Sequence, residues 1–134
     1  MIEGACLCDK IQYAVDGDID NVSHCHCSMC RRIHGAAFAT YAAVPRENFR
    51  WVAGSDLVKA YRSSDTVTRT FCNNCGSTLQ ALFEAEPDVL YLALGTTHGD
   101  PKCRPSYHIF VGSKAPWYRI TDDLPQYDSW SDRT

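Results

Sequence analysis

Apolar residues recur at every second position in short runs along this chain. Clear examples are IQYAV (11–15), FATYAAV (38–44) and VTRTF (67–71), and turn-forming residues separate the runs. This alternation indicates half-buried β-strands, whereas an amphipathic helix repeats every three to four residues. Six further runs are predicted as strands in the same way: 49–52, 57–62, 77–83, 89–94, 107–111 and 117–120.

The pattern as a whole predicts a mostly β fold of short antiparallel strands, because many short strands separated by tight turns form hairpins. One helical turn is expected over residues 28–33, where the alternation stops. We find no internal repeat or linker, so residues 1–134 are interpreted as a single domain. The polar tail, about residues 125–134, is expected to fray.

Composition narrows the class of protein. The 134 residues are 45% hydrophobic and 22% charged, which is enough to bury one core. A net charge of -3 without a Lys/Arg cluster argues against a nucleic-acid partner, and no apolar run is long enough to predict a membrane span. No signal peptide is recognised before the first cysteines, so a cytoplasmic protein is expected. The sequence leaves open whether the chain forms a homodimer.

The cysteines change the picture from a general β domain to a metalloprotein. They fall as C-x-C (Cys6, Cys8), C-x-C-x2-C (Cys25, Cys27, Cys30), C-x2-C (Cys72, Cys75) and a solitary Cys103. In a reducing compartment clustered thiols are more often metal ligands than disulfides.

The spacings have a physical basis. Residues i and i+2 of an extended strand point to one face, so Cys6 and Cys8 are predicted to chelate one ion together, as are Cys25 and Cys27. The stretch FCNNCG is typical of a zinc knuckle, in which two thiols close a tight turn and the following Gly76 takes a positive φ.

Seven clustered thiols are too many for one tetrahedral zinc ion, so we predict two ions. The pair Cys72/Cys75 can join either Cys6/Cys8 or two cysteines of the triple, and spacing alone does not decide. The first pairing leaves the triple as a three-ligand site with a free fourth position. Closed four-ligand sites are typically structural, and sites with a free position are typically catalytic.

Three thiolates leave a zinc ion with net negative charge, which makes it poor at generating hydroxide. Such a site is better suited to accept a further thiol, which metal coordination deprotonates. The bound thiolate stays nucleophilic toward a small carbonyl such as formaldehyde. We therefore hypothesise that the three-cysteine site makes or breaks a carbon–sulfur bond.

The ordered motifs GACLC, CHCSMCRR, FRWVAG, YRSS, RTFCNNCGS and RPSYHIFVGSKAPWY resemble the glutathione-dependent formaldehyde-activating enzyme family, which shares its domain with centromere protein V. The resemblance covers about residues 4–118. It implies a zinc-binding β-tent fold and a carbon–sulfur lyase that adds glutathione to formaldehyde, giving S-hydroxymethylglutathione. It also implies a structural zinc on Cys6, Cys8, Cys72 and Cys75, and a second zinc on Cys25, Cys27 and Cys30.

The resemblance further implies that His108, in the apolar run YHIFV, lines the second zinc pocket and moves the hydroxyl proton. We therefore take Cys25, Cys27, Cys30 and His108 as the candidate catalytic residues. Read from the pattern alone, His108 is a buried core histidine. Arg31 and Arg32 are candidates to balance the thiolate charge.

Where the family often carries Gly-Thr-Leu-Asp-Asp, this chain reads GTTHGD, with His98 in place of an acidic residue. His98 or Cys103 is an alternative fourth ligand of the second zinc. A non-enzymatic binding module with two structural zinc sites is therefore the main alternative function. Zinc-free thiol redox chemistry is a third interpretation.

Overall fold

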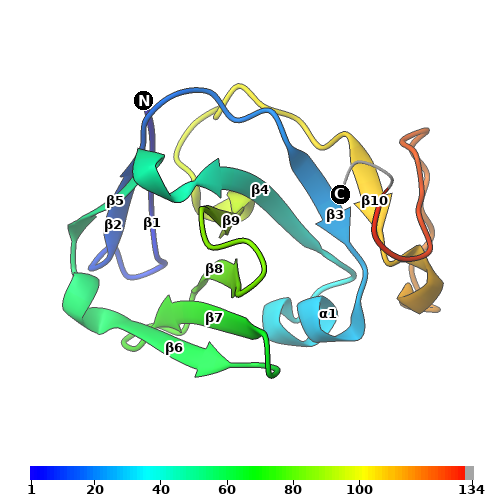
Figure 1. Cartoon of the computed structure of the whole chain (residues 1–134), viewed down its shortest axis with the longest axis horizontal. Helices are drawn as coiled ribbons and strands as arrows, with labels where there is room; N and C mark the ends of the chain where they lie inside the picture. The colour runs from blue at the N-terminus through cyan, green and yellow to red at the C-terminus, as the bar shows by residue number, and fades with distance from the viewer. Residues whose placement is uncertain (132–134) are drawn as a thin grey trace.

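The computed structural model describes residues 1–131 as mostly β-structure with one short helix (Figure 1). The strands are β1 (Ile2–Ala5), β2 (Gln12–Val15), β3 (Val22–Cys25), β4 (Ala39–Pro45), β5 (Phe49–Ala53), β6 (Val58–Arg62), β7 (Val67–Cys72), β8 (Thr78–Phe83), β9 (Val89–Ala93) and β10 (Tyr107–Ile109). The helix is α1 (Ser28–His34), and short 3-10 turns are η1 (Arg46–Asn48), η2 (Ser55–Leu57), η3 (Leu94–Thr96) and η4 (Val111–Ser113). The predicted mostly β class and the helical turn after Cys27 are confirmed.

The strands form two sheets. A three-stranded sheet has the order β1-β2-β5, and a seven-stranded sheet has the order β10-β3-β4-β9-β8-β7-β6. All neighbours are antiparallel except β10, which pairs in parallel with β3. The predicted fold of mostly antiparallel strands is confirmed, and the one parallel pair lies at this edge, where a long connection after β9 brings the chain back alongside β3.

Eight of the nine predicted strands are present, with ends shifted by a few residues. Two strands escaped prediction: β1, which contains a glycine, and β3, whose four residues VSHC carry no apolar alternation. The predicted strand over 117–120 was wrong, since this segment is irregular in the structure. There Trp117 is exposed while the Tyr118 ring packs against Phe38.

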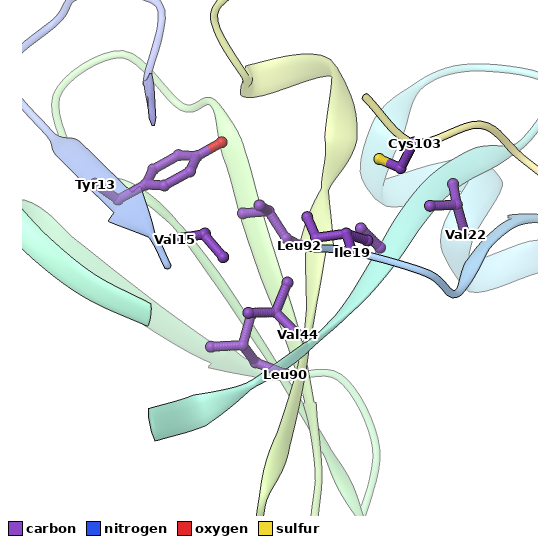
Figure 2. Close-up of a cluster of buried hydrophobic side chains, with 9 residues drawn as sticks. Tyr13, Val15, Ile19, Val22, Val44, Leu90, Leu92 and Cys103 are labelled. Atoms are coloured by element: carbon purple, nitrogen blue, oxygen red, sulfur yellow. The ribbon is translucent and has the colours of Figure 1, made fainter. Parts of the chain in front are cut away.

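The main hydrophobic core fills the space between the two sheets (Figure 2). Tyr13 and Val15 of β2 face Leu90 and Leu92 of β9 across this space. Further members are Ile19, Val22, Ala42, Val44 and Cys103. The small sheet therefore covers one face of the large sheet and leaves the other face for different contacts.

The opposite face of the large sheet carries the second group of buried side chains. The register places Ser23 of β3 beside Tyr41 of β4, and Arg69 of β7 beside Ala81 of β8. Helix α1 lies near one end of β3 and β7, and residues 125–131 lie beside β10 (Figure 1). The helix has seven residues, and no helix within residues 1–131 is long and apolar enough to cross a membrane.

Candidate metal centres

A four-cysteine cluster joins the N-terminal strand to the middle of the chain. Cys6 and Cys8 lie in the turn after β1, Cys72 ends β7, and Cys75 lies in the turn before β8. Their sulfur atoms all lie within 4.8 Å of one another. The structure thus brings together Cys6, Cys8, Cys72 and Cys75, the pairing that the resemblance implied.

The sulfur spacing fits a tetrahedral metal ion. The Cys6 and Cys8 Sγ atoms are 3.5 Å apart, and those of Cys8 and Cys72 are 3.9 Å apart. A tetrahedron with zinc–sulfur bonds of about 2.3 Å has sulfur–sulfur edges of about 3.8 Å. A disulfide requires a far shorter distance of about 2.05 Å, and every cysteine of the chain is a free thiol.

Backbone amides explain why these turns present their sulfurs inward. The Ile11 N–H donates to Cys6 Sγ at 3.3 Å, and the N–H groups of Asn74 and Cys75 each donate to Cys72 Sγ at 3.4 Å. Such donors stabilise thiolates. Gly76 has the predicted positive φ, 83°.

The C-x-C pair converges for a different reason from the one predicted. Cys6 and Cys8 do not lie in an extended strand, because β1 ends at Ala5 and a turn follows. Asp9, with φ 64°, lets the chain reverse, and the Leu7 N–H donates to Ser77 Oγ at 2.8 Å. This bond ties the two cysteine turns to each other.

The four thiols differ in acidity. The Ser77 hydroxyl hydrogen-bonds to Cys75 and lowers the pKa of that thiol to about 5, whereas burial raises the pKa of Cys6 to about 11. Metal binding to all four sulfurs would therefore release the protons that the more basic thiols retain.

A three-cysteine cluster is built where β3 ends and α1 begins. Cys25 is the last residue of β3, Cys27 is the N-cap of α1, and Cys30 lies in the first turn of the helix. The Cys30 N–H donates to Cys27 Sγ at 3.3 Å, so a sulfur replaces the usual capping oxygen. The three sulfurs lie within 4.8 Å of one another, and no other His, Cys, Asp or Glu among residues 1–131 joins them.

This convergence also differs from the predicted one. Cys25 and Cys27 were expected to share one face of a strand, but the strand stops at Cys25. The change from strand to helix swings Cys27 and Cys30 toward Cys25. In the metal-free cluster the hydrogen bond from Cys25 holds the pKa of Cys27 well below its usual value.

Arg69 is the residue of this site that sequence reasoning missed. Its side chain is only 3% exposed, and Nη1 and Nη2 each lie 3.8 Å from Cys30 Sγ. Nη1 also donates to Tyr41 Oη at 3.0 Å, and Nε donates to Ser63 Oγ at 3.1 Å. A charged residue on the inward face of the strand VTRTF was the signal available in the sequence.

The charge of Arg69 complements the thiolates. Although burial opposes it, the neighbouring Tyr41 and Cys30 groups raise the pKa of Arg69 above its ordinary value, so the guanidinium is cationic. A buried cation is stable only beside compensating acceptors or anions. Arg69 thus takes the charge-balancing position that was predicted for Arg31 and Arg32, which the structure places in the last turn of α1.

Tyr41 and His34 extend this network away from the cysteines. His34 Nε2 lies 3.0 Å from Tyr41 Oη, and the two rings meet edge to face. Burial raises the pKa of Tyr41 and lowers the pKa of His34 to about 4, so both groups are neutral near pH 7. A continuous hydrogen-bonded path therefore runs from Arg69 through the tyrosine hydroxyl to a half-buried imidazole.

A cavity of about 50 Å³ lies directly beside the three-cysteine cluster. Cys25, Cys30, Tyr41 and Arg69 form its reactive side. The remaining walls are largely aromatic and apolar and include Phe83, Tyr91, Tyr107 and Trp130. The cluster therefore faces an enclosed space that is mostly apolar apart from the arginine, the thiols and a few hydroxyl groups.

His108 is not brought to this cavity. Its neighbours Tyr107 and Ile109 line the cavity, and His108 pairs with His24 on the opposite face of the sheet. There His108 Nδ1 lies 2.8 Å from His26 Nε2, and its Nε2 lies 3.1 Å from both carboxylate oxygens of Asp122. The catalytic role of His108 stays a prediction, and its position does not support direct contact with a substrate in the cavity.

His26 is fully buried in this histidine group. Burial, reinforced by the charge of His108, lowers the pKa of His26 to about 4. His24 donates to or accepts from Thr40 Oγ1 at 2.8 Å. Among residues 1–131, neither His24 nor His26 belongs to a cysteine cluster; both make hydrogen bonds close to Cys25.

The alternative fourth ligands are also placed elsewhere. Cys103 is buried in the main core near Ile19 and Val22 (Figure 2). The backbone of His98 donates to Glu3 O at 2.8 Å, and the residue is exposed. The suggestion that either residue completes the three-cysteine site was wrong.

The fold and the two clusters define a mostly β protein with one four-cysteine and one three-cysteine cluster, each of which could hold a metal ion. The chain belongs to the family of the glutathione-dependent formaldehyde-activating enzyme, whose model matches residues 1–113. This confirms the resemblance to the formaldehyde-activating enzyme family, while the link to centromere protein V stays a prediction.

Relatives agree with this assignment. A protein of Aspergillus flavus that carries the family's name is 30% identical over 83 residues, which cover 60% of this chain and 44% of that protein. A relative from Aspergillus terreus with the same name is 27% identical over 115 residues, or 81% of this chain and 59% of that protein. An uncharacterized lyase of Schizosaccharomyces pombe is 34% identical over 77 residues, or 58% of this chain and 54% of that protein.

The chain spans about half the length of the curated relatives that it matches. Among solved structures, a Rhodobacter sphaeroides protein has a similar fold, with a TM-score of 0.63 and 24% identity. The superposition covers 73% of this chain and 89% of that protein. It supports the architecture described above and carries no statement about activity.

Proposed function

We propose that this chain is a zinc-dependent carbon–sulfur lyase that joins a glutathione-like thiol to formaldehyde or another small aldehyde, and that catalyses the reverse reaction as well. The observation that carries the proposal is the three-cysteine cluster, which offers three protein ligands and lies against a cavity. Membership of the family supplies the classes of thiol and aldehyde.

The reaction balances without an oxidant or reductant. The thiol loses its S–H proton, and its sulfur forms a bond to the carbonyl carbon. The π bond of the aldehyde C=O group breaks, and its electron pair moves to the oxygen. That oxygen takes up a proton and becomes a hydroxyl group. The chain must therefore favour a thiolate, hold a carbonyl beside it and accommodate negative charge on oxygen.

The cysteine donor sets fit zinc at both clusters. Cys6, Cys8, Cys72 and Cys75 would hold a structural ion, and Cys25, Cys27 and Cys30 would hold the second. Zinc bound to the three cysteines would supply a soft acceptor that lowers the pKa of an incoming thiol. The cytoplasmic location stays a prediction, and it suits a site made of reduced thiols.

Arg69 and Tyr41 are the residues that we assign to the aldehyde oxygen. Both line the cavity beside Cys30, and within residues 1–131 the guanidinium hydrogen-bonds to Ser63 and Tyr41 and pairs with no carboxylate. A fixed cation and a hydroxyl stabilise charge that develops on oxygen, because they need not reorient during the reaction. His34, hydrogen-bonded to Tyr41, connects that hydroxyl to the outside of the cavity.

A non-enzymatic binding module is the second candidate function. One observation favours it: a cavity of about 50 Å³ has room for only a few water-sized groups, far less than a tripeptide thiol needs. For the lyase, only the reacting end of the thiol and the small aldehyde have to meet beside the cluster. Activity therefore separates the two candidates.

The test uses the purified, zinc-loaded chain with glutathione and ¹³C-formaldehyde. Exchange between free formaldehyde and S-hydroxymethylglutathione is measured by NMR and compared with the spontaneous reaction in buffer. We expect exchange above the spontaneous rate, and its loss in Cys30→Ser. An exchange rate equal to that in buffer at a catalytic concentration of protein would rule out the lyase and leave the binding module.

A further inference from the structure

The end of the chain forms part of the wall of the reactive cavity. The family model stops at residue 113, so residues 125–131, here called the C-terminal segment, lie beyond it. The sequence predicted that the polar tail, about residues 125–134, frays; residues 132–134 of it lie outside the described residues. The structure instead lays the C-terminal segment beside β10 (Figure 1, orange to red).

Backbone hydrogen bonds hold the C-terminal segment in place. The His108 N–H donates to Pro125 O at 2.8 Å, and the Tyr127 N–H donates to His108 O at 3.0 Å. The Phe110 N–H then donates to Ser129 O at 3.0 Å. Because β10 is the edge strand of the large sheet, the segment satisfies donors and acceptors that a bare edge would leave open.

The pairing of the C-terminal segment with β10 places the Trp130 side chain against the cavity. Its ring meets Phe83 at a centroid distance of 6.0 Å and Phe110 at 5.0 Å, edge to face in both cases. Trp130 lines the cavity, yet it is 47% exposed. One side of the residue therefore faces the reactive space and the other faces solvent.

The size of the enclosed space sets a limit on what binds there. A volume of about 50 Å³ holds a few water-sized groups, since each needs roughly 10–15 Å³ measured in this way. Aromatic walls leave few directions in which a longer alkyl chain could extend. Trp130 lines this space and is itself half-exposed, so its ring stands between part of the space and solvent.

We propose that Trp130 is a specificity-determining residue that closes the cavity over Cys25 and Cys30 and restricts the carbonyl substrate to one or two carbons. This inference rests on the proposed lyase function for its substrate class. The shielding of the cysteines follows from the geometry and is measurable without any aldehyde.

The activity test compares Trp130→Ala and Trp130→Leu with a matched control, Trp117→Ala. Trp117 is also a C-terminal tryptophan, 71% exposed, but it does not line the cavity. In the zinc-loaded full chain we expect the ratio of kcat/KM for butanal to that for formaldehyde to rise about tenfold or more in Trp130→Ala, because one or more methylene groups gain room. Trp130→Leu should give a smaller rise, and Trp117→Ala none.

The second readout is labelling of Cys25 and Cys30 in the same zinc-loaded proteins, located by peptide mass spectrometry. Iodoacetamide is the small reagent and N-phenylmaleimide the bulky one. We expect the bulky reagent to gain about tenfold in rate relative to the small one in Trp130→Ala, with no change in Trp117→Ala. Trp130→Leu keeps an apolar contact with Phe83 and serves if the alanine variant does not fold.

The outcomes separate the two proposals. If no variant consumes any aldehyde, the lyase proposal fails, and labelling still decides whether Trp130 closes the cavity. If formaldehyde is consumed but neither the butanal ratio nor the labelling ratio changes in folded Trp130 variants, the specificity role is overturned and the lyase proposal stands. Wild-type protein that uses butanal as well as formaldehyde would also overturn the specificity role.

Discussion

The two cysteine clusters of this protein both offer cysteine sulfur atoms as ligands, but the groups that surround those sulfurs differ. The four-cysteine cluster is held by two turns whose amide N–H groups point at sulfur. Cys6 and Cys72 are buried in a small separate core with Ile11 and Leu79, and the other two thiols are partly exposed. The three-cysteine cluster is held by a strand end and a helix start, beside a buried arginine and a cavity.

This difference is the basis for proposing a structural role for the four-cysteine cluster and a catalytic role for the three-cysteine cluster. The four-cysteine cluster provides all four ligands and links segments about seventy residues apart, as the bond from Leu7 to Ser77 shows. The three-cysteine cluster provides one ligand fewer, and a buried arginine and a cavity lie beside it. Under the proposed function the first cluster would stabilise the chain, and the second would receive another molecule.

The largest effect is expected when the four-cysteine cluster is broken. Cys72→Ser removes a fully buried ligand that accepts two amide N–H groups. A structural zinc site contributes folding free energy directly, so we expect loss of one zinc ion and a fall in the free energy of unfolding of more than about 3 kcal/mol. Metal analysis and urea unfolding measure both.

Cys103→Ala is the matched control, because Cys103 is a buried cysteine outside both clusters. It should keep two zinc ions and cost only about 1 kcal/mol. Full metal content and an unchanged unfolding midpoint in Cys72→Ser would contradict the structural role.

The next largest effect concerns activity rather than folding. Cys30→Ser removes the ligand that faces Arg69. We expect one zinc ion per chain instead of two, a loss of more than about 100-fold in kcat/KM, and a smaller change in the urea midpoint than Cys72→Ser produces. Equal destabilisation by the two substitutions would show that the clusters do not differ in the way described.

Arg69 tests the electrostatic side of the comparison. Arg69→Met removes the cation and the bonds to Tyr41 and Ser63, whereas Arg69→Lys keeps the charge but loses the planar fork. Second-layer partners of a metal site change affinity or activity by about 10–100-fold, so we expect such a loss in Arg69→Met and a smaller one in Arg69→Lys. Zinc competition with a chromogenic chelator and aldehyde kinetics measure the two effects. A weaker zinc affinity in Arg69→Lys than in Arg69→Met would contradict the role of charge.

The smallest effects are expected for two residues on opposite faces of the large sheet, Tyr41 and His108. Tyr41→Phe removes the hydroxyl in the cavity and should lower kcat by about tenfold, while zinc content stays at two ions. His108→Gln acts on the far face and should change kcat of the folded protein by less than about threefold, with a loss of stability of about 1–3 kcal/mol. If His108→Gln abolishes activity in folded, zinc-loaded protein and Tyr41→Phe does not, the predicted catalytic histidine is right and the tyrosine assignment is wrong.

Much of the fold was predictable because period-two alternation is a local property of the chain. β2, β4 and β7 to β9 were found in this way, and Gly76 was correctly expected at positive φ. The short strand β3 was missed because its sequence, VSHC, shows no apolar alternation and ends in a cysteine of the three-cysteine cluster. The parallel pairing of β10 with β3 depends on contacts between distant segments, which no local pattern encodes.

The cysteine ligands of the candidate sites could be predicted from the sequence, but the residues around the three-cysteine cluster could not. Cysteine spacing pointed to the seven clustered thiols, and the motif order indicated their division into four and three. Arg69 lies thirty-nine residues from Cys30 in sequence, and Trp130 lies beyond the matched family region. Arg69 reaches the cavity because β7 and β3 belong to the same sheet, and Trp130 reaches it because the C-terminal segment pairs with the edge of that sheet.

The central claim is that one of two zinc sites has three protein sulfurs and a free position that a thiol occupies. X-ray absorption at the zinc edge, on protein with two zinc ions per chain, measures the mean number of sulfur neighbours directly. We expect about 3.5 sulfurs per ion in the free protein, rising to about 4 with saturating glutathione. A value of 4 without thiol, or no change when glutathione is added, would contradict it.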